Sequence, residues 1–355
     1  MFIRRFLAGA FAALLIGSVS TPSLSQSNET IRIGTWNIAN LHHESGVSLR
    51  GSALARDDLD YARLAEVAAQ LDLDIVALQE VGSPAAIARI FPFDQYHVVI
   101  SDRYVAGAED LPANQRDIFT ALVFAKESFP EAPVVTTLDA LSIQHIGIDR
   151  DGTPSSRPTR AGIMVDLEIG GETVRLLGVH LKSSCHRWSL DPIQDQNDDG
   201  RIFSSRFDCR TLDAQLNILE SWIEQQAAQG IPTIVLGDFN RDMNVENTDG
   251  EPIDPFWTQL NDGTPDGLAL AKGPLGTDEI CWPNHRDRFD DHIDFVIYDQ
   301  ALSGLATLDA PEKFSMGHED DPRYATIPDP DDPDGDLRQN QRLSDHCPVV
   351  MEIRN

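Results

Sequence analysis

Pro232-Thr233-Ile234-Val235-Leu236-Gly237-Asp238-Phe239-Asn240 combines an apolar strand with a polar turn at its end. The segment before it repeats apolar residues at the spacing of one helix face, at Leu212, Leu216, Leu219 and Ile223. A helix that leads directly into a buried strand is typical of α/β domains. The stretch therefore predicts a fold of the α/β (α+β) class and places Asp238 and Asn240 where a strand ends.

The same alternation of strands and helices extends over most of the chain. A second helix is predicted by the spacing of Leu64, Val67, Ala68 and Leu71. Hydrophobic periodicity predicts further strands at residues 31–37, 74–80, 96–101, 118–126, 162–169, 173–180, 292–298 and 349–354. No repeat or interdomain linker separates these elements. We therefore expect residues 26–355 to form a single domain of two β-sheets with helices outside.

The first residues of the chain predict an export signal. Arg4 and Arg5 precede an apolar run over residues 6–19, and Ser23 and Ser25 provide small residues before a cleavage point. The apolar run is too short for a good membrane span, which leaves an uncleaved amphipathic anchor as the alternative. We expect residues 1–25 to be a signal peptide. The protein would then be secreted or periplasmic, without stable membrane insertion.

Composition limits the classes of partner. The 355 residues are 41% hydrophobic and 24% charged, which is ordinary for a globular protein. They include 57 Asp and Glu against 28 Lys and Arg, for a net charge of −29, and loss of Arg4 and Arg5 would make the chain more negative. Such a surface repels polyanions unless cations or a local basic patch intervene. This excludes a generic DNA-coating protein but leaves room for an enzyme with a local phosphate site.

Export makes disulfide bonds the expected state of the four cysteines, Cys185, Cys209, Cys281 and Cys347. Four cysteines allow three pairings, and four free buried thiols are the alternative. Cys185–Cys209 is the preferred pair because these two residues bracket one polar insertion. Zinc is disfavoured, since the sequence has no Cys-x-x-Cys spacing.

Polar residues follow or end several of the apolar strands, at Asn37, Glu80, His180, Asp238, Asn240, Asp345 and His346. Strand ends at one edge of a sheet converge on a crevice. Carboxylate and amide oxygens suit Mg²⁺, Mn²⁺ or Ca²⁺ better than zinc. Each residue alone has a simpler explanation as a turn former, a solvated strand end or a core histidine. Asp294, within an apolar strand, could simply pair with an arginine.

Taken in order, these segments resemble the endonuclease/exonuclease/phosphatase superfamily, whose fold is DNase I-like. The matching motifs are Trp36-Asn37, Leu78-Gln79-Glu80, His180-Leu181-Lys182, Gly237-Asp238-Phe239-Asn240, Ile293-Asp294 and Ser344-Asp345-His346. They span essentially all of the mature chain. The resemblance implies a four-layer sandwich of two packed mixed β-sheets flanked by helices, and metal-dependent hydrolysis of phosphate esters.

The resemblance also implies a metal side to the site. Glu80 would be the principal ligand of Mg²⁺ or Mn²⁺, with Asn37 and Asp345 close to the same ion. The charges of the residues themselves also suggest that Lys182 and an arginine of residues 156–160, Arg160 or Arg157, contact the substrate phosphate, although a surface salt bridge is the alternative for both arginines. Residues 182–210 also offer a basic strip for a nucleic acid, made of Lys182, Arg187, Arg201, Arg206 and Arg210.

The acid–base side is implied in the same way. Asp238 would orient or deprotonate the attacking water, and Asn240 would hold a phosphate oxygen. His346, oriented by Asp294, would act as acid or base or bind the phosphate. His180 would stabilise the charge that develops in the transition state. The family's deoxyribonucleases and sphingomyelinases carry histidine at the position of His180, whereas its apurinic endonucleases carry tyrosine.

A second cation site is suggested by the polar insertion. Asp195, Asn197 and Asp199 match the start of a calcium loop, Asp-x-Asn-x-Asp-Gly. Loop position twelve is Arg206 instead of glutamate, which argues against an EF-hand. We expect either a truncated structural Ca²⁺ loop or an Asx-rich turn.

These observations favour a secreted, divalent-metal-dependent phosphoesterase that cleaves phosphodiesters by in-line attack of water. An extracellular nuclease acting on DNA or RNA is the first choice, and a monomer is expected. Phospholipid or small-molecule phosphodiesterases and phosphomonoesterases are the alternatives. A non-catalytic binding module of the same fold is disfavoured, because every expected catalytic position is filled.

Overall fold

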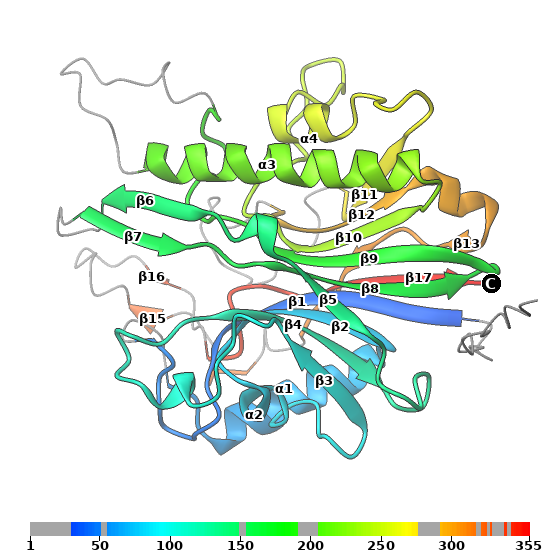
Figure 1. The fold of residues 1–355 in the computed structure, drawn as a ribbon. Coiled ribbons are helices and arrows are strands. Elements are labelled where there is room, and N and C mark those ends of the chain that lie inside the picture. Colours follow the sequence, from blue (N-terminus) through cyan, green and yellow to red (C-terminus); the bar gives the residue numbers. More distant parts are fainter. Residues whose placement is uncertain are drawn as a thin grey trace, which may run out of the picture.

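Two mixed β-sheets pack face to face, and helices cover their outer faces (Figure 1). The computed structural model describes residues 30–50, 55–148, 154–190, 205–275, 292–316, 321–324, 327–328, 337–338 and 342–355. The expected signal peptide, the calcium loop at Asp195, Asn197 and Asp199, and Cys281 lie outside the described residues. The arrangement confirms the predicted fold class.

The first sheet has seven strands, with β14 beside β17 and the others in the order β13-β17-β1-β2-β4-β3. Their bounds are β1 Thr30–Leu41, β2 Ile75–Val81, β3 Tyr96–Ile100, β4 Phe119–Ala125, β13 Thr307–Leu308, β14 Glu312–Lys313 and β17 Val349–Arg354. β1 and β2 are parallel, and α1 (Asp58–Leu71) lies between them in the chain. α2 (Pro84–Ile87) follows β2 on the same side of the sandwich (Figure 1).

The second sheet has six strands in the order β11-β12-β10-β9-β8-β5. Their bounds are β5 Val135–Leu138, β8 Gly162–Ile169, β9 Glu172–His180, β10 Thr233–Asp238, β11 Leu270–Gly273 and β12 Asp294–Asp299. β9 and β10 are parallel, and α3 (Ser205–Ala228) lies between them in the chain. α4 (Pro255–Leu260) packs with α3 over the outer face of this sheet (Figure 1).

Two short hairpins and three 3₁₀ turns complete the described elements. The hairpins pair β6 (Gln144–Ile148) with β7 (Pro154–Pro158) and β15 (Ile327–Pro328) with β16 (Leu337–Arg338). The 3₁₀ turns are Ala108–Asp110, Asp139–Leu141 and Gln300–Gly304. None of the helices in the described part of the chain is long and apolar enough to span a membrane.

The core between the sheets changes from apolar to polar along the strands. Alternate residues of β1 face the second sheet, and Ile31 and Ile33 belong to the same buried cluster as Ile234 and Leu236 of β10. The next β1 position on this face, Thr35, is buried and hydrogen-bonds the side chain of Gln79. The period of two then places Asn37 and Asp238 at the polar end of this core.

The predicted helix faces are buried as expected. Leu64, Val67, Ala68 and Leu71 of α1 pack against the first sheet, and the apolar face of α3 packs against the second. α1 begins with a capping box, in which the Asp57 side chain accepts from the backbone of Asp60 and the Asp60 side chain accepts from the backbone of Asp57.

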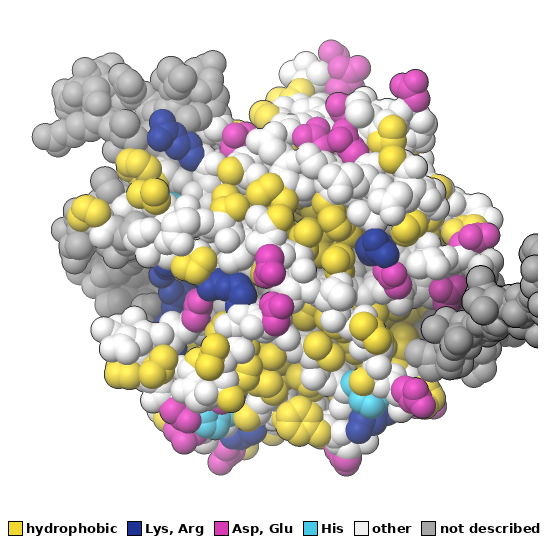
Figure 2. All heavy atoms as spheres, in the orientation of Figure 1, with side chains coloured by type: hydrophobic (Ala, Val, Ile, Leu, Met, Phe, Trp, Pro, Cys, Tyr) yellow, Lys and Arg dark blue, Asp and Glu magenta, His cyan; other side chains and the backbone are white. Residues whose placement is uncertain are grey.

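The strands that periodicity missed lie outside the central rows. β5 and β11 are edge strands of four residues each, and β6 and β7 form a hairpin with prolines at both ends of β7. Short or proline-containing segments carry little period-two signal. Figure 2 shows Lys and Arg side chains gathered at the left, below the β6–β7 hairpin, while acidic side chains are scattered over the rest of this face.

Candidate active site

Strand register alone brings three of the predicted residues together in the second sheet. Asp238 on β10 is paired with His180 on the parallel strand β9 and with Asp294 on the antiparallel strand β12. Residues directly opposite one another on neighbouring strands point to the same face of a sheet. The three side chains therefore form one row, and His180 Nε2 lies 3.4 Å from Asp238 Oδ2.

Two hydrogen bonds connect this row to segments of the first sheet. Asn37 Nδ2 on β1 donates to Asp238 Oδ2 at 3.0 Å, while Asn37 Oδ1 accepts from the backbone N–H of Ala39 at 3.0 Å. His346, just before β17, donates from Nδ1 to Asp294 Oδ2 at 2.6 Å. Residues that are far apart in the sequence thus form one buried cluster where the two sheets meet.

The environment sets different protonation states for the titratable groups. Burial raises the pKa of Asp238 to about 7. Burial, followed by the positive charge of Arg160, lowers the pKa of His180 well below its usual value. Burial disfavours a charge on His346, but the nearby carboxylates of Asp294, Asp345 and Asp238 together outweigh burial and raise the pKa of His346 well above its usual value. At neutral pH the cluster therefore combines a cationic His346 with a neutral His180.

Asn240 holds Asp238 from the turn after β10. Its backbone N–H donates to Asp238 Oδ1 at 2.8 Å, and its φ of 53° lies in the left-handed region that asparagine tolerates. Its side-chain amide donates to the carbonyl of Leu181 at 3.2 Å. The structure therefore shows Asn240 as a support for Asp238 and for the end of β9.

Glu80 lies at the end of β2 with an unusual backbone conformation. Its φ is 58°, and its Oε2 accepts from both the backbone N–H and the side-chain amide of Asn40, at 3.0 and 2.8 Å. Burial and the nearby charge of Asp345 raise the pKa of Glu80. Asn40 Oδ1 is buried and has no hydrogen-bond partner among the described residues. Glu80 and Asp345 repel each other, and the amide oxygen of Asn40 lies beside Glu80 without a partner in the described part of the chain. Oxygen atoms of this kind are suitable ligands for a hard divalent cation.

A second group of possible ligand atoms lies in the acid–base cluster. One atom each from Asp238, Asp294 and His346 lies within 4.8 Å of the others. One of these contacts is the short His346–Asp294 hydrogen bond, so a cation there would compete with that pair. The metal ligands implied by the resemblance are Asn37, Glu80 and Asp345. They adjoin this group through the hydrogen bond between Asn37 and Asp238, and their role as ligands remains a prediction.

Arg56 supports the first-sheet side of the site, and the sequence analysis missed it. Its buried guanidinium donates to the carbonyls of Ile38 at 2.6 Å, Ala39 at 2.9 Å and Leu343 at 2.9 Å. These carbonyls belong to the irregular end of β1 and to the segment that precedes Asp345. Burial lowers the pKa of Arg56 to about 10, so the side chain stays charged at neutral pH. A single arginine in a loop has no periodicity that would reveal this role.

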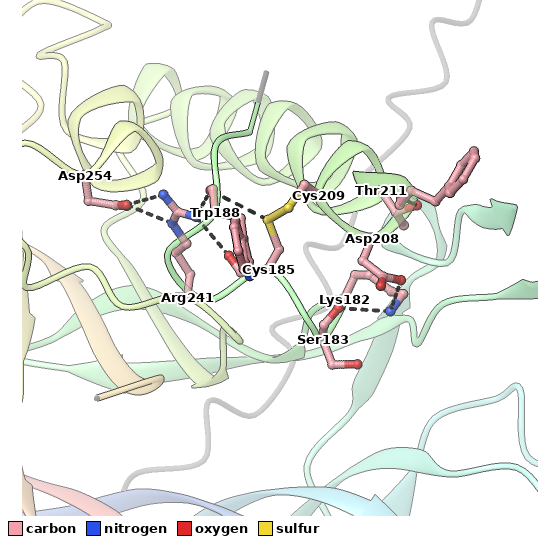
Figure 3. The surroundings of a disulfide bond; sticks show 10 residues. Lys182, Ser183, Cys185, Trp188, Asp208, Cys209, Thr211, Arg241 and Asp254 are labelled. Atoms are coloured by element: carbon pink, nitrogen blue, oxygen red, sulfur yellow. Dashed lines mark hydrogen bonds and ion pairs between the residues drawn. A yellow bond between two sulfur atoms is a disulfide. The ribbon is translucent and has the colours of Figure 1, made fainter. Parts of the chain in front are cut away.

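The disulfide Cys185–Cys209 confirms the preferred pairing, and Cys347 is disulfide-bonded as well. Figure 3 shows the bond joining the segment after β9 to α3, next to the ion pair of Lys182 Nζ with Asp208 Oδ1 at 2.6 Å. Lys182 also donates to the carbonyl of Ser183 at 2.9 Å. The bond therefore fixes the helix end that carries Asp208.

The predicted basic strip is wrong for Lys182, which is only 6% exposed. Arg187 is exposed but is held by Asp242 at 2.8 Å. Arg201 and the side chain of Arg206 lie outside the described residues, and Arg210 is exposed on α3. The alternation of basic residues in the sequence could not show that Lys182 turns inward to Asp208.

Arg160 and Lys182 line one cavity with Glu80 and His180, as expected for residues near the site. Arg160 donates to the carbonyl of Leu181, and its Nε is buried without a hydrogen-bond partner among the described residues. Asp117 lines the same cavity, where it pairs with Arg103 at 3.4 Å. These contacts bring both predicted substrate-binding residues beside the cluster.

Comparison with known proteins gives one family. Residues 34–346 match the Endonuclease/Exonuclease/phosphatase family. This range begins in β1 and ends at His346, so it contains every predicted residue of the central cluster. No curated protein sequence matches this chain significantly.

Similar solved structures have low sequence identity. An endonuclease/exonuclease/phosphatase from Beutenbergia cavernae is 18% identical, covers 92% of this chain and 72% of its own, and has a TM-score of 0.49. A humanized D. rerio TDP2 is 17% identical, covers 92% of this chain and 100% of its own, and has a TM-score of 0.48. The human Nocturnin catalytic domain is 16% identical, with coverages of 92% and 94% and a TM-score of 0.47.

Proposed function

This chain belongs to the Endonuclease/Exonuclease/phosphatase family, and from that premise we propose that it is an exported phosphodiesterase that acts on nucleic acid. Members of this family are metal-dependent hydrolases of phosphate esters. The observation that carries the proposal is the contact of Asp238 with His180 in its own sheet and with Asn37 in the other. A carboxylate held between two sheets in a buried cluster is well placed for general base catalysis.

In the proposed reaction Asp238 orients and deprotonates the attacking water. Its raised pKa makes it a stronger base than an exposed aspartate once it is ionised. Asn37 and the backbone of Asn240 each donate to one of its oxygens, which fixes the direction in which it can accept a proton. The side chain of Asn240 would also contact a phosphate oxygen.

The two histidines have complementary parts in the proposal. His346 is held by Asp294, which fixes its tautomer and favours its charged form, so it would donate a proton or bind the phosphate. His180 is neutral and has a buried Nδ1 without a hydrogen-bond partner among the described residues. It would face the phosphate and stabilise the charge that develops in the transition state.

Glu80, Asp345 and Asn37 are proposed to hold Mg²⁺ or Mn²⁺. When bound, a divalent cation supplies positive charge opposite a phosphoryl oxygen. Asn40 would keep Glu80 in place through its two hydrogen bonds. The repulsion between Glu80 and Asp345 supports this assignment, because a cation would remove it.

Export is supported by cysteine chemistry. Cys185 and Cys209 form a disulfide, and no cysteine in the described part of the chain is free. Stable disulfides are typical of secreted and periplasmic proteins. The proposed signal peptide would direct the chain to such a compartment.

A small-molecule phosphodiesterase or phosphomonoesterase is the second candidate. The net charge of −29 favours it, because a long polyanion is repelled more strongly than a small ester. Arg157 and Arg160 favour the nuclease, since they line the cavity beside Glu80 and His180 and provide local positive charge there.

Plasmid nicking by the purified mature protein in Mg²⁺ and Ca²⁺ tests the proposal. We expect nicking that EDTA abolishes and that His346→Ala reduces by about 10²–10⁴-fold, the usual contribution of a catalytic acid or base. Circular dichroism of the variant controls for folding. A folded wild-type protein that does not nick DNA would exclude the nuclease, and hydrolysis of bis(p-nitrophenyl) phosphate would then test the small-molecule alternative.

A further inference from the structure

A basic cavity adjoins the proposed reaction centre on the side of Glu80 and His180. Its volume is about 70 Å³, several times the roughly 10–15 Å³ that one water molecule needs. Four cationic side chains from separate segments line it, namely Arg50, Arg157, Arg160 and Lys182, beside two carboxylates, Glu80 and Asp117. The proposed hydrolysis needs positive charge at one phosphate only. The cavity holds more positively charged side chains than one phosphate requires.

The cationic residues come from three places in the fold. Arg50 lies in the loop between β1 and α1, Arg157 and Arg160 belong to β7 and the residues after it, and Lys182 follows β9. Arg50 is close enough to Arg160 to lower its pKa by repulsion. In a chain of net charge −29, convergence of these like charges requires a reason beyond chance.

The cations differ in how they are satisfied. Lys182 is neutralised by Asp208, and Arg160 donates to the carbonyl of Leu181. Neither Arg50 nor Arg157 has an ion pair or a side-chain hydrogen bond within the described residues. Two guanidinium groups are thus available at the cavity, beside the unpartnered Nε of Arg160.

Guanidinium groups bind phosphate oxygens through paired N–H donors. We propose that this cavity, which we call the second anion subsite, binds a second phosphate group of the substrate, next to the ester that is hydrolysed. The inference rests on the proposed function, because it takes the hydrolysed ester to lie beside Glu80 and His180. The second phosphate is either the next one along a nucleic acid strand or the second group of a small bisphosphate.

Binding of two nucleotides that differ by one phosphate tests the subsite. Thymidine 3′,5′-bisphosphate and thymidine 5′-monophosphate are titrated by calorimetry into the wild type and into Arg50→Gln and Arg157→Gln. We expect the wild type to bind the bisphosphate about tenfold more tightly than the monophosphate, because one charge-assisted hydrogen bond contributes an affinity difference of that order. Each variant should lose most of that preference.

Arg354→Gln is the matched control. It removes the same charge from the far end of β17, where Arg354 pairs with Asp309. The control should keep the wild-type preference for the bisphosphate. Equal affinity of the wild type for the two nucleotides, or a preference that Arg50→Gln and Arg157→Gln both retain, would overturn the subsite.

The source of the second phosphate is distinguished with a thymidine trinucleotide. If both arginine variants weaken its binding as they weaken that of the bisphosphate, the subsite accepts a phosphate within a strand. If they weaken only the bisphosphate, it accepts a terminal phosphate of a small molecule. These readouts are binding constants, so they can support the subsite even if the protein cleaves no diester. Absence of cleavage would then count against the proposed function alone.

Discussion

β1–α1–β2 in the first sheet and β9–α3–β10 in the second are built on the same plan. Each contains two parallel strands with a helix between them in the chain, and each pair is flanked by antiparallel neighbours. Each of the four strands also carries a polar residue at or near its end, and these residues are Asn37, Glu80, His180 and Asp238. The two units differ in how those side chains are brought into position.

In the second sheet, regular strand pairing is sufficient to bring the polar side chains together. Asp238 is in register with His180 on one side and with Asp294 on the other, so the strands themselves form the row. In the first sheet the pairing of β1 and β2 shifts between Asn37 and Leu41, and Glu80 has a positive φ. Such conformations are costly for residues other than glycine and persist only where the surroundings impose them.

The loops after β1 and β9 are also held by different means. In the first unit the guanidinium of Arg56 holds carbonyls of the β1 end and of the segment before Asp345. In the second unit the disulfide Cys185–Cys209 holds the loop against α3. The comparison indicates that the irregular backbone near the proposed metal ligands depends on one buried cation, whereas the proposed acid–base residues depend on register and a covalent bond.

The largest expected effect separates the two sides by their response to metal. Glu80→Gln and Asp238→Asn should each lower kcat/KM for bis(p-nitrophenyl) phosphate by about 10²–10⁴-fold. A higher concentration of Mg²⁺ or Mn²⁺ should partly restore the activity of Glu80→Gln, because a weakened metal site still binds the ion when the ion is abundant. It should not restore the activity of Asp238→Asn. Rates measured against metal concentration check this. Equal recovery of both variants would contradict the division into a metal side and an acid–base side.

Arg56→Ala should give the largest loss of stability, about 3–4 kcal/mol in the free energy of unfolding, because several buried carbonyls lose their donor. Arg56→Lys should lose less, since an ammonium can still reach some of these carbonyls. Urea unfolding monitored by circular dichroism measures both. A loss in Arg56→Ala no larger than in a surface control such as Arg354→Ala would show that the first unit does not depend on this cation.

Removal of the disulfide comes next. The double variant Cys185→Ser/Cys209→Ser should lose about 2–4 kcal/mol, the usual contribution of a bridge, and the 24-residue separation of the two cysteines lies within the ordinary range of loops. Its kcat should fall less than that of Asp238→Asn, because register still forms the row in the second sheet. Urea unfolding together with kcat on bis(p-nitrophenyl) phosphate tests this. A fall in kcat as large as that of Asp238→Asn would show that the covalent bond, and not register, positions the acid–base residues.

The same contrast explains what could be predicted from the sequence. Period-two patterns were enough to predict β10, β9 and β12, and polar strand ends pointed to His180 and Asp238, whereas Asp294 entered the candidate site only through the resemblance to the family. The disulfide followed from the two cysteines that bracket the insertion. The role of Arg56 and the ion pair between Lys182 and Asp208 could not be predicted, because they depend on contacts between loops that no local pattern encodes.

The smallest expected effect concerns pH and the β6–β7 hairpin. His145 on β6 lies near Lys182, Arg157, Arg160 and Asp208, and its Nδ1 lies 2.7 Å from Thr211 Oγ1. Burial, assisted by the positive charge of Lys182, lowers the pKa of His145, while Asp208 acts in the opposite direction. Since the unfolded chain binds this proton more readily, the stabilisation is present above the ordinary histidine pKa and is lost as pH falls below it.

His145→Gln should therefore make the stability of the protein less dependent on pH. The difference in unfolding free energy between pH 7.5 and pH 5 should shrink by less than about 1 kcal/mol, because Asp208 partly compensates the charge. Arg56 keeps its charge over this range, so Arg56→Lys should leave that difference unchanged. Urea titrations at both pH values measure it. A larger pH dependence in His145→Gln than in the wild type would mean that the native state binds the proton, in which case the contact with Asp208 outweighs burial.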